Sequence, residues 1–147
     1  MFPWALGALL QMIVVAPPEL RPAVRPLSKR YSSGQRITVE VLVTNVGVTA
    51  ATLPANMSPR FNWLDFIVVA PNGERLPFVG VAYRGLGEGE VVLLPTHKFG
   101  ADFDLRQYYA IKTAGLYQLA AIYRPPRTQD GTDIPETRSS TVTFVVE

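Results

Sequence analysis

The sequence contains no cysteine and only one histidine, and these two shortages limit its chemistry more than any other feature. Without cysteine the chain has no disulfide bond, thiolate nucleophile, zinc ribbon or iron–sulfur cluster. His97 cannot form a two-histidine metal site, and no second histidine is present to serve a Ser/His/Asp triad elsewhere. We therefore expect a protein that is not an enzyme and that uses no metal, cofactor or small-molecule substrate.

An excess of charge of one sign is also lacking. The chain has 14 Lys and Arg against 12 Asp and Glu, a net charge of +2, and no long basic stripe, which disfavours nucleic-acid binding. The one local excess is Arg21, Arg25, Lys29 and Arg30 against Glu19. It is either the solvated flank of a strand or a patch that faces a membrane or a partner.

Length and composition favour one compact domain. The chain has 147 residues, of which 48% are hydrophobic, and this is too apolar for a disordered protein. Its 13 prolines and 11 glycines are spread along the sequence. A helical bundle does not tolerate so many residues that interrupt helices. A fold of short strands and turns is expected.

The longest apolar run is residues 2–16, FPWALGALLQMIVVA, in which Gln11 is the only strongly polar side chain. As a helix it would be about 22 Å long, shorter than the ~30 Å hydrocarbon core of a bilayer. We expect a short helix over residues 3–16, with Pro3 in its first turn and Pro17-Pro18 at its end. Its anchor side chains are Phe2, Trp4, Leu6, Leu9, Leu10, Met12, Ile13 and Val14.

Such a segment needs apolar cover, because exposure to water forfeits about 25 cal/mol per Å² of apolar surface. Lipid, detergent or a protein partner would supply it. Two alternatives stay open: the segment contributes to the core of its own domain, or it is a secretory signal. As a secretory signal, the segment would lack a preceding Lys or Arg. Pro17, directly after Ala16, would also disfavour cleavage by a signal peptidase. The basic residues follow the segment, which conflicts with an exported domain if the helix spans the membrane.

The rest of the chain is typical of an all-β fold. Residues 37–44 alternate, with Ile37, Val39, Val41 and Val43 on one face. Asn72-Gly73 predicts a type I′ hairpin turn. Other strands are expected at 49–53, 61–70, 74–79, 90–94, 98–105, 116–124 and 141–146, with an edge strand within 19–34 and a helical turn at 106–112. About seven to nine short strands at this spacing predict an antiparallel β-sandwich. The domains are then residues 1–18, the apolar helix, and 19–147, the sandwich.

Residues 34–123 resemble bacterial immunoglobulin-like modules of the deuterolysin N-terminal type and, more loosely, a bacterial intracellular proteinase inhibitor family. The matching residues are Gly34-Gln35-Arg36-Ile37-Thr38-Val39, Thr44-Asn45, Asp104-Leu105, Tyr108-Tyr109, Gly115-Leu116-Tyr117 and Tyr123. The resemblance implies an immunoglobulin-like sandwich. Peptidase activity is not implied, because the chain lacks the H-E-x-x-H motif of the deuterolysin catalytic domain.

Two pairs of aromatic residues have structural interpretations. Tyr117, shortly after a reversal at Gly115, is placed like a corner tyrosine whose hydroxyl bonds nearby backbone, and Tyr108 and Tyr109 favour packing over ligand stacking. Trp63 and Phe66 point to opposite faces of a strand by parity. They cannot both enter one core, so one of them marks a partner surface or a second packed face.

Several polar groups are candidate sites. The glycine-rich stretch 85–89 lacks the Lys and Ser/Thr of a phosphate loop. Asp130, Asp133 and Glu136 are a solvated loop rather than a calcium site, and Asp102 and Asp104 are exposed strand residues rather than paired acids. His97 is expected to make a surface hydrogen bond. None of these groups predicts catalysis.

The sequence therefore predicts a non-catalytic accessory subunit that attaches to a membrane-embedded protein complex through residues 2–16, for example a respiratory or photosynthetic electron-transfer complex. Its location would be the periplasmic or extracytoplasmic face of the membrane. The alternative is a soluble exported binding module or protease inhibitor, which would use an exposed loop at 83–90 or 127–136.

Overall fold

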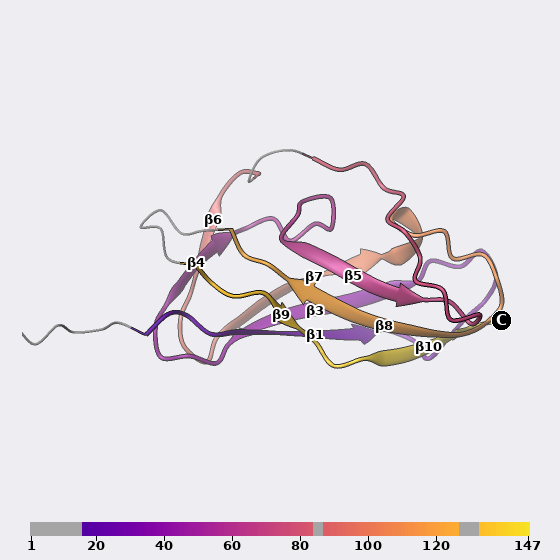
Figure 1. Cartoon of the computed structure of the whole chain (residues 1–147), viewed down its shortest axis with the longest axis horizontal. Helices are drawn as coiled ribbons and strands as arrows, with labels where there is room; N and C mark the ends of the chain where they lie inside the picture. The colour runs from indigo at the N-terminus through magenta and orange to yellow at the C-terminus, as the bar shows by residue number, and fades with distance from the viewer. Residues whose placement is uncertain (1–15, 84–86, 127–132) are drawn as a thin grey trace, which may run out of the picture.

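The computed structural model describes residues 16–83, 87–126 and 133–147, and these form strands joined by turns (Figure 1). The strands are β1 Leu20–Pro26, β2 Arg30–Tyr31, β3 Thr38–Asn45, β4 Ala51–Pro54, β5 Leu64–Val69, β6 Glu90–Leu93, β7 Lys98–Asp104, β8 Gly115–Tyr123, β9 Thr137–Arg138 and β10 Val142–Val146. A short 3-10 helix, η1 Leu105–Gln107, takes the place of the helical turn expected over 106–112.

Two sheets form the body of the molecule. One has the order β1-β3-β7 and the other the order β2-β10-β8-β5, with β9 paired to β8. The pairings are antiparallel except for β2 and β10, which run parallel. Strands β4 and β6 form a separate antiparallel ribbon at the end of the molecule where the chain enters at residue 16 (Figure 1). The predicted all-β fold with antiparallel sheets is confirmed.

The core lies between the two sheets, and period-two alternation places it there. Ile37, Val39, Val41 and Val43 are fully buried, as their alternation predicts. On the facing sheet, buried side chains come from alternate positions of β8 and from β5 and β10: Tyr117, Leu119, Ala121, Tyr123, Phe66, Val68 and Phe144. Burial of these apolar side chains is the main favourable contribution to the fold.

The basic segment of the sequence lies in and after β1, at the edge of the smaller sheet. Arg25 forms an ion pair with Glu40 on β3 at 3.2 Å, and Arg30 forms one with Glu147 at 3.1 Å. Two of the four cations are therefore paired with carboxylates of the sandwich itself. Prolines 22 and 26 fit an edge position, because proline cannot donate to a further strand.

The hairpin after β5 differs from the prediction. Gly73 N donates to Ala70 O at 2.9 Å, and Gly73 has φ +86°, whereas Asn72 has no positive φ. The turn is therefore a three-residue loop ending in a left-handed glycine, not a type I′ turn. Proline at its first position fixes a φ of about −65°, which type I′ does not allow.

The strand expected over 74–79 was also wrong. Leu76 N still donates to Val68 O, but Pro77 has no N–H to continue the pairing. The chain instead leaves β5, and Phe78 bridges to Tyr109 after η1. Phe78 stacks on Tyr108, with ring centroids 6.0 Å apart. Residues 77–83 thus cross the open side of the sandwich as an extended strap.

The parity argument for Trp63 and Phe66 was wrong as well, since both side chains are buried. Trp63 precedes β5 and lies in a turn, so strand alternation does not govern it. Its Nε1 donates to Asn56 O at 2.7 Å, and its ring stacks on Phe61 at 4.6 Å. Neither residue marks a partner surface.

The helix expected over residues 3–16 lies almost wholly outside the described residues, as does the loop 127–132. Ala16, where the description begins, is exposed and belongs to no element. In the part of the chain that the structure describes, no helix has the length and apolar character needed to cross a membrane.

Candidate functional site

Asn45, the last residue of β3, organises the end of the sandwich where the chain enters. Its side chain is fully buried. The Nδ2 group donates to Thr49 O and Leu93 O, both at 2.9 Å, and Oδ1 accepts from Gly47 N at 3.0 Å. Its backbone pairs with His97 O and Thr96 N. One amide thus joins the turn 46–49, the end of β6 and the turn 95–97, and satisfies backbone groups that would otherwise lack partners.

The entering chain is fixed to the same turn. Thr49 Oγ1 donates to Ala16 O at 2.7 Å, and Val46 N donates to Glu19 O at 2.9 Å. Glycine is required at position 47, because a Cβ there would lie 2.9 Å from Glu19 N. Residues 16–19 therefore run directly beside the turn 46–49, without a spacer.

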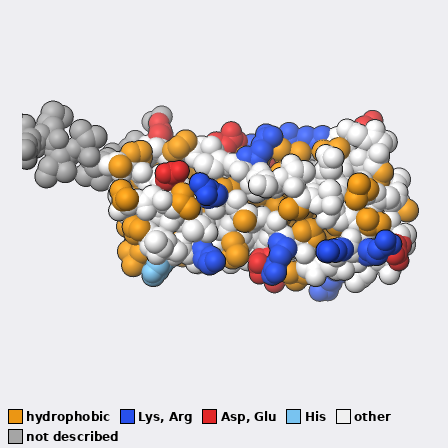
Figure 2. Space-filling model, turned by 90° about the horizontal axis from the view of Figure 1, so that it is seen from below, with side chains coloured by type: hydrophobic (Ala, Val, Ile, Leu, Met, Phe, Trp, Pro, Cys, Tyr) orange, Lys and Arg blue, Asp and Glu red, His pale blue; other side chains and the backbone are white. Residues whose placement is uncertain are grey.

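Four exposed apolar side chains gather at this end: Val48 is 82% exposed, Val92 62%, Leu94 47% and Val46 39%. We call Val46, Val48, Val92 and Leu94 the apolar end. Figure 2 shows hydrophobic side chains clustered at the left-hand end of the molecule, with the histidine beside them. Val92 lies opposite Thr52 in the β4–β6 ribbon, a two-stranded element whose outer side has no third layer in the described chain.

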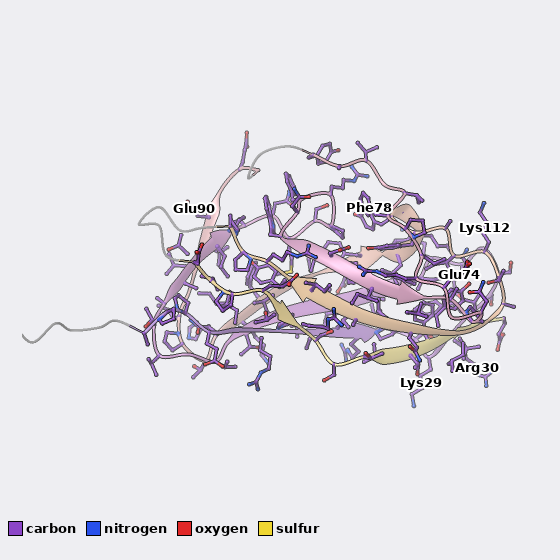
Figure 3. All side chains as sticks on the ribbon, viewed as in Figure 1. Lys29, Arg30, Glu74, Phe78, Glu90 and Lys112 are labelled. Atoms are coloured by element: carbon purple, nitrogen blue, oxygen red, sulfur yellow. The ribbon has the colours of Figure 1, made fainter. Side chains whose placement is uncertain are left out.

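Charges near the apolar end are few and mixed. Arg21 and Lys98 both pair with Thr44 in their strands, next to Asn45. Glu19 lies beside Val46, and Glu90 begins β6 (Figure 3). His97 is exposed, and its backbone carbonyl accepts from Asn45 N. The end therefore has no excess of positive charge that would select an anionic partner.

A second candidate is a small cavity of about 170 Å³ between the 58–63 loop, the start of β5 and the strap. It is lined by Pro59, Arg60, Phe61, Asn62, Leu64, Asp65, Phe78, Ala82 and Arg124. The Arg60 guanidinium lies 5.3 Å from the Tyr83 ring and 5.9 Å from the Tyr108 ring, and it donates to Tyr83 Oη at 2.7 Å. These contacts hold Arg60 by cation–π attraction.

The carboxylate in this cavity is already engaged. Asp65 Oδ1 accepts from Tyr109 Oη at 3.0 Å and from Phe66 N at 2.8 Å, and Oδ2 lies 3.7 Å from Arg75 and from Arg124. Burial, and then the charge of Asp65, raise the pKa of Tyr109 above its ordinary value. The single Tyr109 hydroxyl proton is shared between Asp65 Oδ1 and Phe66 O, and Phe66 N donates to Tyr109 Oη at 3.2 Å, so Tyr109 covers the free edge of β5. The cluster is built to hold the strap side of the sandwich together.

The polar candidates from the sequence do not come together. Asp104 caps η1, accepting from Arg106 N and Ile37 N, whereas Asp102 is exposed opposite Glu40. Glu136 forms an ion pair with Arg124. Asp130 lies outside the described residues, and within those residues no three His, Cys, Asp or Glu side chains are grouped so that they could hold a metal ion.

The two corner residues lie at the start of β8. Tyr117 is buried, and its hydroxyl donates to Thr113 O at 2.7 Å, with Thr113 Oγ1 at 2.9 Å. Gly115 has φ +134°, and a Cβ there would lie 2.7 Å from Pro71. The predicted anchor residues Phe2, Trp4, Leu6, Leu9, Leu10, Met12, Ile13 and Val14 all lie outside the described residues.

Sequence reasoning named Asn45 among the residues of the family resemblance and missed its role. The available signal is an asparagine directly after an alternating strand and two residues before a glycine, which predicts a local side-chain bond to Gly47. Its bond to Leu93, 48 positions away, depends on the tertiary fold. The exposed valines were missed because β-rich sequence alone does not tell which faces are covered.

The chain matches no protein-family model and no curated protein sequence. Among solved structures it is similar to the CARDB domain of a Pyrococcus furiosus protein in complex with di-metal ions, with 16% identity, a TM-score of 0.46 and coverage of 88% of this chain and 89% of that one. It is also similar to part of a β-glucosidase from Listeria innocua, with 12% identity, a TM-score of 0.44 and coverage of 88% of this chain and 16% of that one.

At these identities and TM-scores, neither likeness adds to what the strand pairing of this chain shows. Of the resemblance noted in the sequence, the β-sandwich holds, and neither of these two structures is a deuterolysin or proteinase-inhibitor module.

Proposed function

We propose that this protein is a non-catalytic accessory subunit whose β-sandwich is attached through residues 2–16 to a membrane-embedded protein complex, on the extracytoplasmic face. The observation that carries the proposal is the position of the apolar end. Val46, Val48, Val92 and Leu94 surround the point where the apolar N-terminal sequence joins the sandwich, and Thr49 holds Ala16 there. Adjacent apolar surfaces favour one continuous nonaqueous contact.

The finer fold belongs to the same proposal, as an immunoglobulin-like module. The order β1-β3-β7 facing β5-β8-β10 corresponds to strands A, B, E and C, F, G of that fold. Tyr117, near the start of β8, bonds backbone four residues upstream, as the corner tyrosine of strand F does. Such modules present loops at the two ends of the sandwich, and here one end carries the apolar side chains.

A non-catalytic role is supported by how the titratable groups are used. Asp65 holds Tyr109 and faces two arginines, Asp104 caps η1, and Glu136 pairs with Arg124. These carboxylates stabilise the fold through contacts that catalytic proton transfer would have to break.

The test is extraction of native membranes with mild detergent, followed by gradient sedimentation and intact-mass measurement of the full chain. Wild type is expected to migrate with membrane subunits and to retain residues 1–16. Leu9→Arg should release the chain into the soluble fraction, because a cation in the apolar segment opposes membrane attachment. Leu27→Arg is the matched control, since Leu27 is an exposed leucine on the sandwich. A soluble, shortened wild-type chain without partners would refute the proposal.

The second candidate, an exported protein-binding module or protease inhibitor, is favoured by the strap. Val79, Val81 and Tyr83 are exposed at alternate positions of an extended segment that leads into the loop 83–90. Alternate exposed side chains on extended backbone are what β-type peptide recognition uses. A protease-inhibition assay of the chain, with Val81→Asp as the disrupting variant, would distinguish this candidate from a membrane subunit.

A further inference from the structure

We propose that the apolar end is itself a lipid-binding surface, which inserts into the interfacial region of a zwitterionic bilayer without net charge. The long axis of the sandwich then points away from the membrane. This inference rests on the proposed membrane attachment through residues 2–16 and names a second contact, made by the folded domain. It assigns the orientation of the molecule: β4, β6 and the turn 46–49 face the lipid, and the C-terminus faces water (Figure 1).

Hydrogen bonds fix the turn 46–49 beside the end of the apolar N-terminal sequence. Ala16 is the last residue of the apolar sequence, and its carbonyl is bonded to Thr49 Oγ1 at 2.7 Å. Glu19 O is bonded to Val46 N at 2.9 Å. The end of the apolar sequence at Ala16 is thus fixed beside the turn, one residue from Val48, and a bilayer that reaches Ala16 also reaches Val48.

Several backbone groups of this end have hydrogen-bond partners within the protein. A turn that enters lipid must satisfy its polar groups internally, since each unsatisfied group costs several kcal/mol there. Asn45 accepts from Gly47 N and donates to Thr49 O and Leu93 O, and Val46 N is bonded to Glu19 O. Exposed turns usually leave such groups to water. Here a fully buried amide supplies the partners.

The shape and charge of the apolar end favour lipid over a protein groove. Val48 is at the tip of a turn with 82% of its surface exposed, and Val92 and Leu94 come from a different element. The surface therefore projects outward, as an insertion surface does. Arg21 and Lys98 are offset by Glu19 and Glu90, so attraction to anionic headgroups is not expected. Apolar burial alone must supply the affinity, which predicts weak dependence on salt.

The absence of native cysteine allows a direct test with single-cysteine variants of the full chain. Val48→Cys and Leu116→Cys would each carry an environment-sensitive fluorophore; Leu116 is 54% exposed at the other end of the sandwich, where Gly115 pairs with Val146. With vesicles of pure phosphatidylcholine, the label at position 48 should shift to the blue and become protected from an aqueous quencher. The label at position 116 should remain exposed.

Vesicle flotation of charge variants provides the second measurement. Val48→Asp should lower the bound fraction about tenfold or more, because it replaces a side chain whose burial favours binding with a carboxylate. Val81→Asp is the matched control on the strap, where the valine is 65% exposed, and should bind as wild type. Circular dichroism of both variants checks that they are folded.

The outcomes separate this inference from the proposed function. If the chain floats with vesicles while position 48 stays as accessible as position 116, the lipid-binding surface is refuted and attachment through residues 2–16 stands. If position 48 is protected only in native membranes that contain protein subunits, and not in phosphatidylcholine, the occupant is a membrane protein and the inference is again overturned. If no vesicle binding occurs, both contacts with lipid are refuted, and the sedimentation experiment decides the proposed function independently.

Discussion

The two ends of the sandwich differ in the side chains that they expose, although the end opposite the apolar end also exposes Leu116. At the apolar end, one buried amide holds the turns, and Val46, Val48, Val92 and Leu94 are exposed. At the other end, which we call the charged end, the exposed side chains include Lys29, Arg30, Glu74, Lys112 and Glu147, four of which are labelled in Figure 3. The difference lies in the turns and in the β4–β6 ribbon, which is present at the apolar end alone in the described part of the chain.

Strand β8 shows the difference within one element, because it carries a buried tyrosine near each end. At the charged end the Tyr117 hydroxyl is bonded to Thr113. Towards the apolar end the Tyr123 hydroxyl is buried and has no hydrogen-bond partner in the described part of the chain. Within β8, the buried hydroxyl nearer the charged end is therefore bonded, whereas the one nearer the apolar end is not.

The largest expected effect is that of Asn45→Ala, which should lower the free energy of unfolding by about 2–4 kcal/mol, because Thr49 O, Leu93 O and Gly47 N lose their partner. Urea denaturation of the full chain measures it. Asn72→Ala is the control: Asn72 is exposed in the turn after β5 and accepts one bond, from Glu74 N. Its expected cost is about 0.5–1 kcal/mol. Equal losses in the two variants would contradict the central role of Asn45.

These elements also show which parts of the fold were predictable. The alternation in 37–44 predicted β3 and its buried face, because a sheet with one covered face imposes period two on local sequence. Trp63 and Phe66 could not be placed by parity, since a turn precedes β5 and resets the phase. The strand expected over 74–79 does not form, because Pro77 has no N–H to continue the pairing with β5, and the sequence alone does not show which neighbour that position faces.

The candidate site was less predictable than the fold. Apolar character at residues 2–16 predicted an attachment, but Val48 and Val92 look like ordinary strand or turn residues in the sequence. Only the pairing of β4 with β6 leaves Val92 on an uncovered side. Long-range contacts such as Asn45 to Leu93 decide where exposed apolar groups meet, and no local pattern encodes them.

The two tyrosines of β8 give a matched pair of smaller effects. Tyr117→Phe should cost about 1–2 kcal/mol, because Thr113 O loses a bond, whereas Tyr123→Phe should change the free energy of unfolding by less than about 0.5 kcal/mol or stabilise the fold. Both variants keep the ring and its packing. Chemical denaturation in parallel is the measurement. A large loss on Tyr123→Phe would mean that its hydroxyl has a partner after all.

At alkaline pH the difference in free energy of unfolding between wild type and Tyr123→Phe should change by roughly 1 kcal/mol. Burial raises the pKa of Tyr123 above its ordinary value of 10.0. The folded state therefore keeps a proton that the unfolded chain loses, and stability present below pH 10 declines as the pH rises above it, by up to about 1.4 kcal/mol per pH unit for each such tyrosine. Tyr109 contributes in the same direction. Denaturation midpoints between pH 9 and 11 should fall less steeply for Tyr123→Phe than for wild type, and parallel slopes would refute this.

The smallest effect is expected at the charged end itself. Arg30 and Glu147 form an ion pair at 3.1 Å with side chains 71% and 55% exposed, and water screens such a pair, so Arg30→Gln should cost at most about 0.5–1 kcal/mol and less in high salt. Arg30→Gln should also bind phosphatidylcholine vesicles as wild type does, because the charged end faces away from the lipid. A loss of vesicle binding comparable to that of Val48→Asp would mean that the charged end contacts the membrane, and the assignment of the two ends would have to be reversed.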